Sequence, residues 1–187
     1  MSSWSVSGGG AFADFGTVEF GGKQRRVDWS YVKVWTPSGG GGCPILYVYD
    51  GSEYIHEGLL DIHDPDGIDV TTNHTLVTTP MRVQSAYRLR LIEHPQTISH
   101  IDQVKLYAIL PDETLIELQL IGAWHSEYGN VLPQLLFSDG WKTETLGADH
   151  NNGVSQSIEL RFAALSPKLN AISFVFQIEG NNRYYKY

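Results

Sequence analysis

The sequence predicts an all-β domain, an antiparallel β-sandwich or jelly roll with little helix. Charged residues make up only 18% of the chain, whereas 19 residues are glycine and 12% are aromatic, a composition that suits strands and tight turns better than helices. Short runs alternate apolar and polar residues, as strands do when one face lies in a core and the other in solvent. No segment has the periodicity of an amphipathic helix.

The bulk properties limit the domain organisation and the partners. The 187 residues, 42% of them hydrophobic, are enough to build one domain with its own core. The formal net charge of -8 argues against nucleic acid and anionic membranes as partners, because both select basic surfaces. No window of about 18 apolar residues is present, so we expect no membrane insertion. The single cysteine, Cys43, excludes an internal disulfide, and we interpret it as a small buried hydrophobe.

Residues 1–42 are interpreted as an N-terminal arm and linker, and residues 43–187 as the sandwich domain. The arm is rich in glycine, has strand-like runs, and ends in four consecutive glycines at 39–42. We expect its runs to form edge strands of the same sheet, or a strand donated to a neighbouring copy, which would build a polymer. The first ten residues lack the basic and apolar regions of a signal peptide, which predicts either an intracellular protein or a processed mature form.

The clearest strand signal is a hairpin at residues 43–56. Asp50-Gly51 lies between two runs of β-branched and aromatic residues, and this dipeptide favours a two-residue type I′ turn because both positions need a positive φ. Leu46, Val48 and Ile55 would then share one face, and Tyr47 and Tyr54 would share the other. The expected cross-strand pairs are Tyr47 with Tyr54 and Leu46 with Ile55.

Further strands follow along the chain, separated by proline, glycine and acidic residues. They are expected at 71–79, 83–93, 100–110, 114–121, 155–165 and 171–179. Residues 100–110 and 114–121 would form a second hairpin, and 122–153 would be a long loop with one helical turn at 132–137. Alternation groups three sets of residues on single strand faces: Tyr87, Leu89 and Leu91; Ile158, Leu160 and Phe162; and Ile172, Phe174, Phe176 and Ile178.

Two segments carry a resemblance to known proteins. Residues 43–51 read Cys-Pro-Ile-Leu-Tyr-Val-Tyr-Asp-Gly, and residues 101–108 read Ile-Asp-Gln-Val-Lys-Leu-Tyr-Ala. In these segments the chain resembles a poorly characterised group of archaeal and bacterial β-sandwich domains that occur in exported proteins. The resemblance covers roughly residues 43–110, with an extension to about residue 180 left open. It implies an extracellular sandwich module and brings no catalytic residues.

The best candidate for a metal site is acidic. Asp61, Asp64, Asp66 and Asp69 surround the turn Pro65-Asp66-Gly67. Several carboxylates at short range, with a glycine that permits a sharp turn, are what a calcium ion requires. The alternative is an exposed turn in which the aspartates cap backbone N–H groups.

Histidines beside acidic residues suggest a second metal site. His100 and Asp102 lie two apart on an expected strand, and His125 and Glu127 have the same spacing. Three histidines from different loops would bind zinc or iron, whereas loop histidines are more often only polar. No nucleophile elbow, phosphate loop or dinucleotide fingerprint is present, so no catalytic residue is predicted.

Aromatic residues beyond the needs of a sandwich core indicate a binding surface. They are Trp4, Trp29, Trp35, Trp124, Trp141, Tyr184, Tyr185 and Tyr187. Such rings stack on sugars or line protein interfaces, although core and edge packing would account for many of them.

These observations favour a non-enzymatic, extracellular or cell-surface structural protein that self-associates into a filament or surface layer. The alternatives are a calcium-supported carbohydrate-binding module and an enzyme with a loop-built metal site. The expected partners are other copies of the chain or carbohydrate. Calcium is the one expected cofactor.

Overall fold

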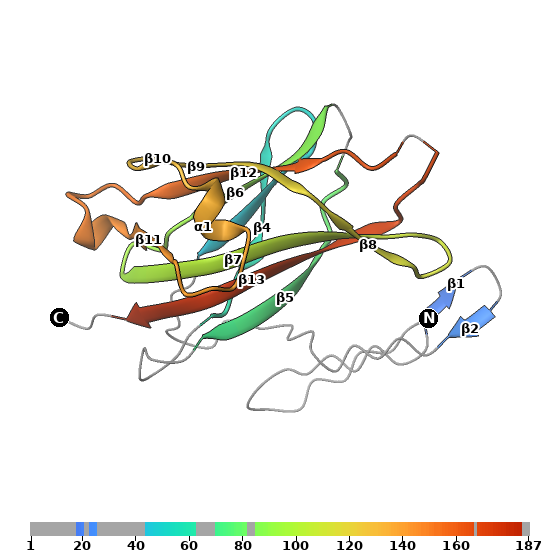
Figure 1. The fold of residues 1–187 in the computed structure, drawn as a ribbon, viewed down its shortest axis with the longest axis horizontal. Helices are drawn as coiled ribbons and strands as arrows, with labels where there is room; N and C mark the ends of the chain where they lie inside the picture. Colours follow the sequence, from blue (N-terminus) through green and yellow to red (C-terminus); the bar gives the residue numbers. More distant parts are fainter. Residues whose placement is uncertain are drawn as a thin grey trace.

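The computed structural model describes residues 18–20, 23–25, 44–62, 70–81, 85–166 and 168–184. Two antiparallel sheets form an all-β, sandwich-like fold (Figure 1), as the sequence predicts. One sheet has six strands in the order β10-β9-β12-β6-β3-β4. The other has the order β11-β7-β13-β5, and β8 also pairs with β7. Of the N-terminal arm, the structure describes only the hairpin β1 (Val18–Phe20) and β2 (Lys23–Arg25). This hairpin forms a two-stranded sheet of its own, so the prediction that the arm adds edge strands to the main sheet is wrong for these described residues.

The strands of each sheet and the helical elements have the following residue ranges. The six-stranded sheet consists of β3 (Ile45–Tyr49), β4 (Tyr54–Leu59), β6 (Ala86–Ile92), β9 (Leu120–His125), β10 (Gly129–Asn130) and β12 (Ser157–Ala163). The other sheet consists of β5 (Thr71–Val77), β7 (Thr97–Ile109), β8 (Leu115–Leu118), β11 (Thr143–Leu146) and β13 (Ser173–Tyr184). The helical elements are α1 (Leu132–Leu135) and the 3-10 turn η1 (Ala148–His150).

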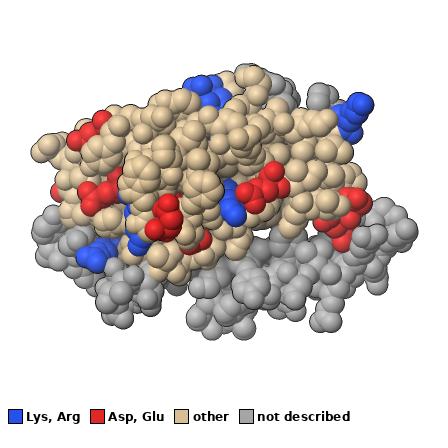
Figure 2. Space-filling view, in the orientation of Figure 1, with Lys and Arg blue, Asp and Glu red and all other residues tan. Residues whose placement is uncertain are grey.

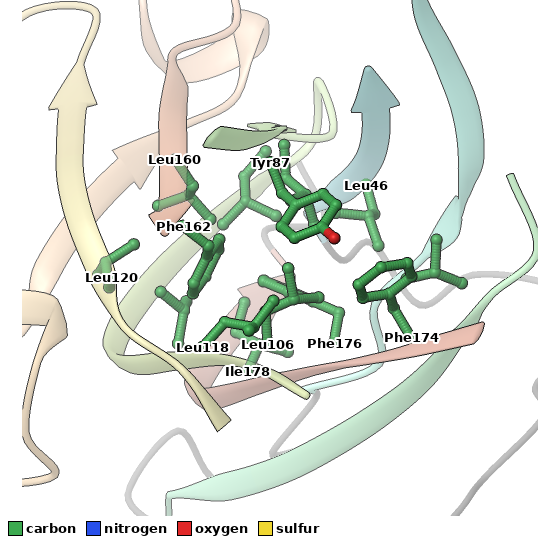
Figure 3. Packing of buried hydrophobic residues seen from close by; sticks show 14 of the residues in the cluster. Leu46, Tyr87, Leu106, Leu118, Leu120, Leu160, Phe162, Phe174, Phe176 and Ile178 are labelled. Atoms are coloured by element: carbon green, nitrogen blue, oxygen red, sulfur yellow. The ribbon is translucent and has the colours of Figure 1, made fainter. Parts of the chain in front are cut away.

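The core lies between the sheets and is built by the alternation seen in the sequence. Leu160 and Phe162 of one sheet and Phe176 and Ile178 of the other are fully buried and lie close together (Figure 3). Full burial of one such side chain stabilises the fold by about 1.5–3 kcal/mol. The three predicted strand faces are buried except at one position. Ile172 is 42% exposed because it precedes β13.

The hairpin β3–β4 exists, but its predicted loop and register are wrong. Tyr49 pairs with Tyr54, and Tyr47 pairs with His56. The Asp50 N–H donates to the Glu53 carbonyl, so the loop is longer than two residues. The Asp50 carboxylate accepts the N–H groups of Ser52 (2.7 Å) and Glu53 (3.0 Å), and this side-chain turn stabilises the longer loop. The faces are as predicted, because Leu46 and Val48 are buried.

The predicted loop at 122–153 is wrong, and so is the simple return at 114–121. Only β8 pairs with β7 there, and the chain then enters the other sheet as β9, which pairs with β12. The supposed loop holds the end of β9, then β10, α1, β11 and η1. These elements are short, and their partners lie far along the sequence, so local periodicity does not reveal them. The helical turn at 132–137 is present as α1.

The last strand is longer than predicted and includes the polar residues 180–184. β13 pairs with β7 along its whole length, and the register shifts between Glu179 and Gly180. Asp102 of β7 has no partner in β13 at this shift, so β7 carries a β-bulge there. Ile101 lies inward before the bulge, and Val104 lies inward after it.

Candidate binding face

The predicted calcium ligands are only partly described. Asp61 lies after β4, whereas Asp64, Asp66 and Asp69 lie outside the described residues. Among the residues that the structure describes, no three His, Cys, Asp or Glu side chains are grouped as metal ligands. Calcium binding by this segment stays a prediction.

His100 and Asp102 do not meet as predicted. His100 Nε2 lies 3.1 Å from Glu144 of the neighbouring strand. The Asp102 carboxylate instead accepts the Gly140 N–H at 3.1 and 3.2 Å. The β-bulge at Asp102 is the reason, since an extra residue breaks the alternation that would place both side chains on one face.

His125 is buried and fixes a turn. Its Nδ1 accepts the N–H groups of Glu127 (3.1 Å) and Tyr128 (3.2 Å), and its ring stacks on that of Tyr128. Burial lowers the pKa of His125, and this effect outweighs the Glu127 carboxylate, which favours the charged ring. The neutral imidazole therefore serves as a structural acceptor.

The carboxylate of Glu93 is a second buried polar group. Glu93 follows β6 and is 2% exposed. It accepts hydroxyl groups from Thr97 of β7 (2.5 Å) and Thr145 of β11 (2.7 Å), together with the His94 N–H (3.2 Å). Burial raises the pKa of Glu93, although these hydrogen bonds favour the charged form. The cluster ties three strands together.

The strongest concentration of binding chemistry lies on the outer face of the six-stranded sheet. Alternation buries Leu89 and Leu91, and so turns Arg88 and Arg90 of the same strand outward. Because β6 lies between β3 and β12 in the sheet, outward side chains of neighbouring strands line up with these arginines in two rows that cross the strands. We call the residues of both rows the arginine–aromatic face. The first row is Tyr54, Tyr49, Arg88, Arg161 and Gly122, and the second is His56, Tyr47, Arg90, Glu159 and Trp124.

Glu159 lies among three guanidinium groups at the centre of this face. Its Oε1 is 3.0 Å from Arg88 and 3.1 Å from Arg161, and its Oε2 is 3.6 Å from Arg90. Burial alone would raise the pKa of Glu159, but the hydrogen bonds from Arg88 and Arg161 outweigh it and hold the pKa below its usual value. Glu159 is therefore ionised at neutral pH.

Tyrosines flank the arginines on one side. The Arg90 guanidinium lies 4.0 Å from the ring centre of Tyr54, and that of Arg88 lies 5.0 Å from the ring centre of Tyr49. The two tyrosine rings are 5.3 Å apart. Burial, and then the Glu159 carboxylate, raise the pKa of Tyr54. These cation–π contacts hold the guanidinium groups in place.

Trp124 flanks the arginines on the other side. Trp124 is 42% exposed, and the Arg161 guanidinium lies 4.7 Å from the centre of its ring. The far edge of the ring occupies the space that a Cβ at position 122 would need. Gly122 therefore leaves the space in which the indole lies along the strand.

The charge of this face differs from that of the whole molecule. It carries three arginines and one glutamate, whereas the chain has a net charge of -8. On the side drawn in Figure 2, the charged groups of the described residues are small and scattered. Sequence reasoning noticed the alternation of Arg88 and Arg90 but missed the face, because Glu159 and Trp124 reach it only through strand pairing.

No protein family, curated protein or solved structure matches this chain. No helix in the described part of the chain is long and apolar enough to cross a membrane. The fold and the face together define an all-β, sandwich-like protein with an arginine- and aromatic-lined outer sheet.

Proposed function

We propose that the protein is a non-catalytic binding module whose arginine–aromatic face binds an extended carbohydrate chain. The observation that carries this proposal is the arrangement of Tyr54 and Trp124 on opposite sides of a row of guanidinium groups. Aromatic rings offer apolar faces to the C–H surfaces of sugars, and arginine forks donate hydrogen bonds to oxygen acceptors.

The length of the arginine–aromatic face favours a polymeric carbohydrate as the ligand. The rows run from β4 through β3, β6 and β12 to β9, which at about 4.8 Å per strand spans roughly 19 Å. A platform of this length would contact several units of an extended chain at once. Each contact is weak, and their sum would provide the affinity.

Trp124→Ala tests this proposal, with Trp141→Ala as its matched control. Trp141 is 57% exposed, but it lies in the loop before β11 and outside the arginine–aromatic face. Both variants and the wild type would be run in affinity electrophoresis through gels containing hydroxyethylcellulose, xylan or polygalacturonate. We expect retardation of the wild type and of Trp141→Ala in at least one gel, and loss of retardation for Trp124→Ala. Free migration of the wild type in every gel, or equal loss in both variants, would refute the proposal.

Calcium support is a separate part of this proposal. It depends on Asp61 and on the acidic residues at 64–69. Calcium bound to the native state alone would raise the melting temperature. We expect a higher melting temperature in calcium than in chelator, and an unchanged value would remove calcium from the proposal.

Self-association is a second candidate function, favoured by the edges of the sheets. Among the described strands, β4 pairs only with β3, and β5 pairs only with β13. An edge strand can accept a strand from another copy, and the N-terminal arm would supply it. Removal of residues 1–36 should then lower the particle size measured by light scattering, and an unchanged size would exclude assembly through the arm.

A further inference from the structure

We propose that the ligand of the arginine–aromatic face is an acidic polysaccharide, a polyuronate, and that Glu159 occupies the position of a ligand carboxylate in the free protein. This inference rests on the proposed carbohydrate-binding function and names the class of carbohydrate.

The geometry around Glu159 shows that the three guanidinium groups fit a carboxylate. Both carboxylate oxygens are engaged, one by Arg88 and Arg161 and the other by Arg90. A uronic acid unit presents the same planar group with two oxygens. Arginine, rather than lysine, is the residue that matches this planar geometry.

The charge of the face leaves room for a second carboxylate. One glutamate faces three arginines, so the face has two more positive than negative charges among these four residues. Arg161 is the most open of the three, with its side chain 45% exposed. The rest of this acidic chain would repel a polyanion, which would direct such a ligand to this face.

The neighbouring rings prepare the arginines for binding. Tyr54, Tyr49 and Trp124 lie against the guanidinium groups of Arg90, Arg88 and Arg161 respectively. Side chains that are already ordered lose less conformational entropy when a ligand binds. The same rings would contact the sugar units between the carboxylates.

Glu159→Gln gives the sharpest test, because it removes the internal carboxylate and keeps the size of the side chain. Binding of a polygalacturonate hexamer and of neutral cellohexaose would be measured by calorimetry. We expect affinity for the acidic hexamer to rise roughly five- to tenfold in Glu159→Gln, with no change for cellohexaose.

Glu117→Gln is the matched control for charge. Glu117 pairs with Lys105 at 3.6 Å on the other sheet, so this variant changes the net charge equally without touching the face. Its affinity should stay within twofold of the wild type. Arg161→Gln provides a second variant that does not depend on the folding of Glu159→Gln, and we expect it to lose about tenfold in affinity for the acidic hexamer.

The outcomes separate the two proposals. If cellohexaose binds as tightly as the acidic hexamer and neither Glu159→Gln nor Arg161→Gln changes binding, the polyuronate inference is wrong and carbohydrate binding stands. If dextran sulfate binds more tightly than the acidic hexamer, recognition of carboxylate is also wrong, and the face responds to polyanions in general. If no carbohydrate binds, both proposals fail.

Discussion

Gly180 provides the most direct test of the structure, because backbone atoms occupy the space next to it. A Cβ at position 180 would lie closer than 3.0 Å to the His100 carbonyl oxygen, and 3.1 Å from the Ile101 Cα. These atoms belong to β7, which pairs with β13 on this side. The new methyl group therefore cannot be accommodated by rotating a side chain, and β7 and β13 would have to separate.

The expected cost follows from this separation. The strands would move apart by on the order of 1 Å, which forfeits a substantial part of the local van der Waals contact. Overpacking of this kind costs about 1–3 kcal/mol, and each weakened ladder hydrogen bond adds about 1 kcal/mol. We expect Gly180→Ala to lower the free energy of unfolding by about 3 kcal/mol. For a chain of this size that loss corresponds to a decrease in melting temperature of about 6–12 °C.

Urea denaturation followed by tryptophan fluorescence would measure this difference, with Gly122→Ala as the control. The three atoms nearest to a Cβ at position 122 all belong to the indole of Trp124, an exposed side chain that can move away. The control should lose less than about 1 kcal/mol, although displacement of the indole should weaken carbohydrate binding. If Gly180→Ala is as stable as Gly122→Ala, our account of the bulge between β7 and β13 is wrong.

Three further predictions concern single side chains. The raised pKa of Glu93 means that the native state retains a proton that the unfolded chain loses above the ordinary value of 4.5. Stability should therefore fall as pH rises from 4.5, and Glu93→Gln should remove this dependence in urea titrations at several pH values. The lowered pKa of His125 has the opposite sign, so stability should fall as pH drops below 6.5. His125→Asn, which keeps an acceptor for the turn, should flatten that part of the profile. Finally, the Glu57 carboxylate accepts the backbone N–H groups of Thr78 and Thr79, and Glu57→Gln should cost about 1–2 kcal/mol in thermal unfolding.

Short-range pattern was enough to predict the strand faces. Leu89 and Leu91 are buried and Arg88 and Arg90 point outward because successive side chains of any strand leave opposite faces. This rule depends only on local backbone geometry. The same reasoning failed at Asp102, where a β-bulge inserts one residue and reverses the alternation.

Pairing between strands that are distant in the sequence decided which outward side chains lie together. Arg90, Glu159 and Trp124 are far apart in the sequence, and they form one row only because β6, β12 and β9 are neighbours in the same sheet. The order of strands in a sheet depends on how the whole chain closes its loops and buries both inner faces together. Local sequence pattern is enough to specify an all-β fold with alternating faces. Which of the outward residues meet depends on the folded arrangement, because those contacts arise only when distant strands pair.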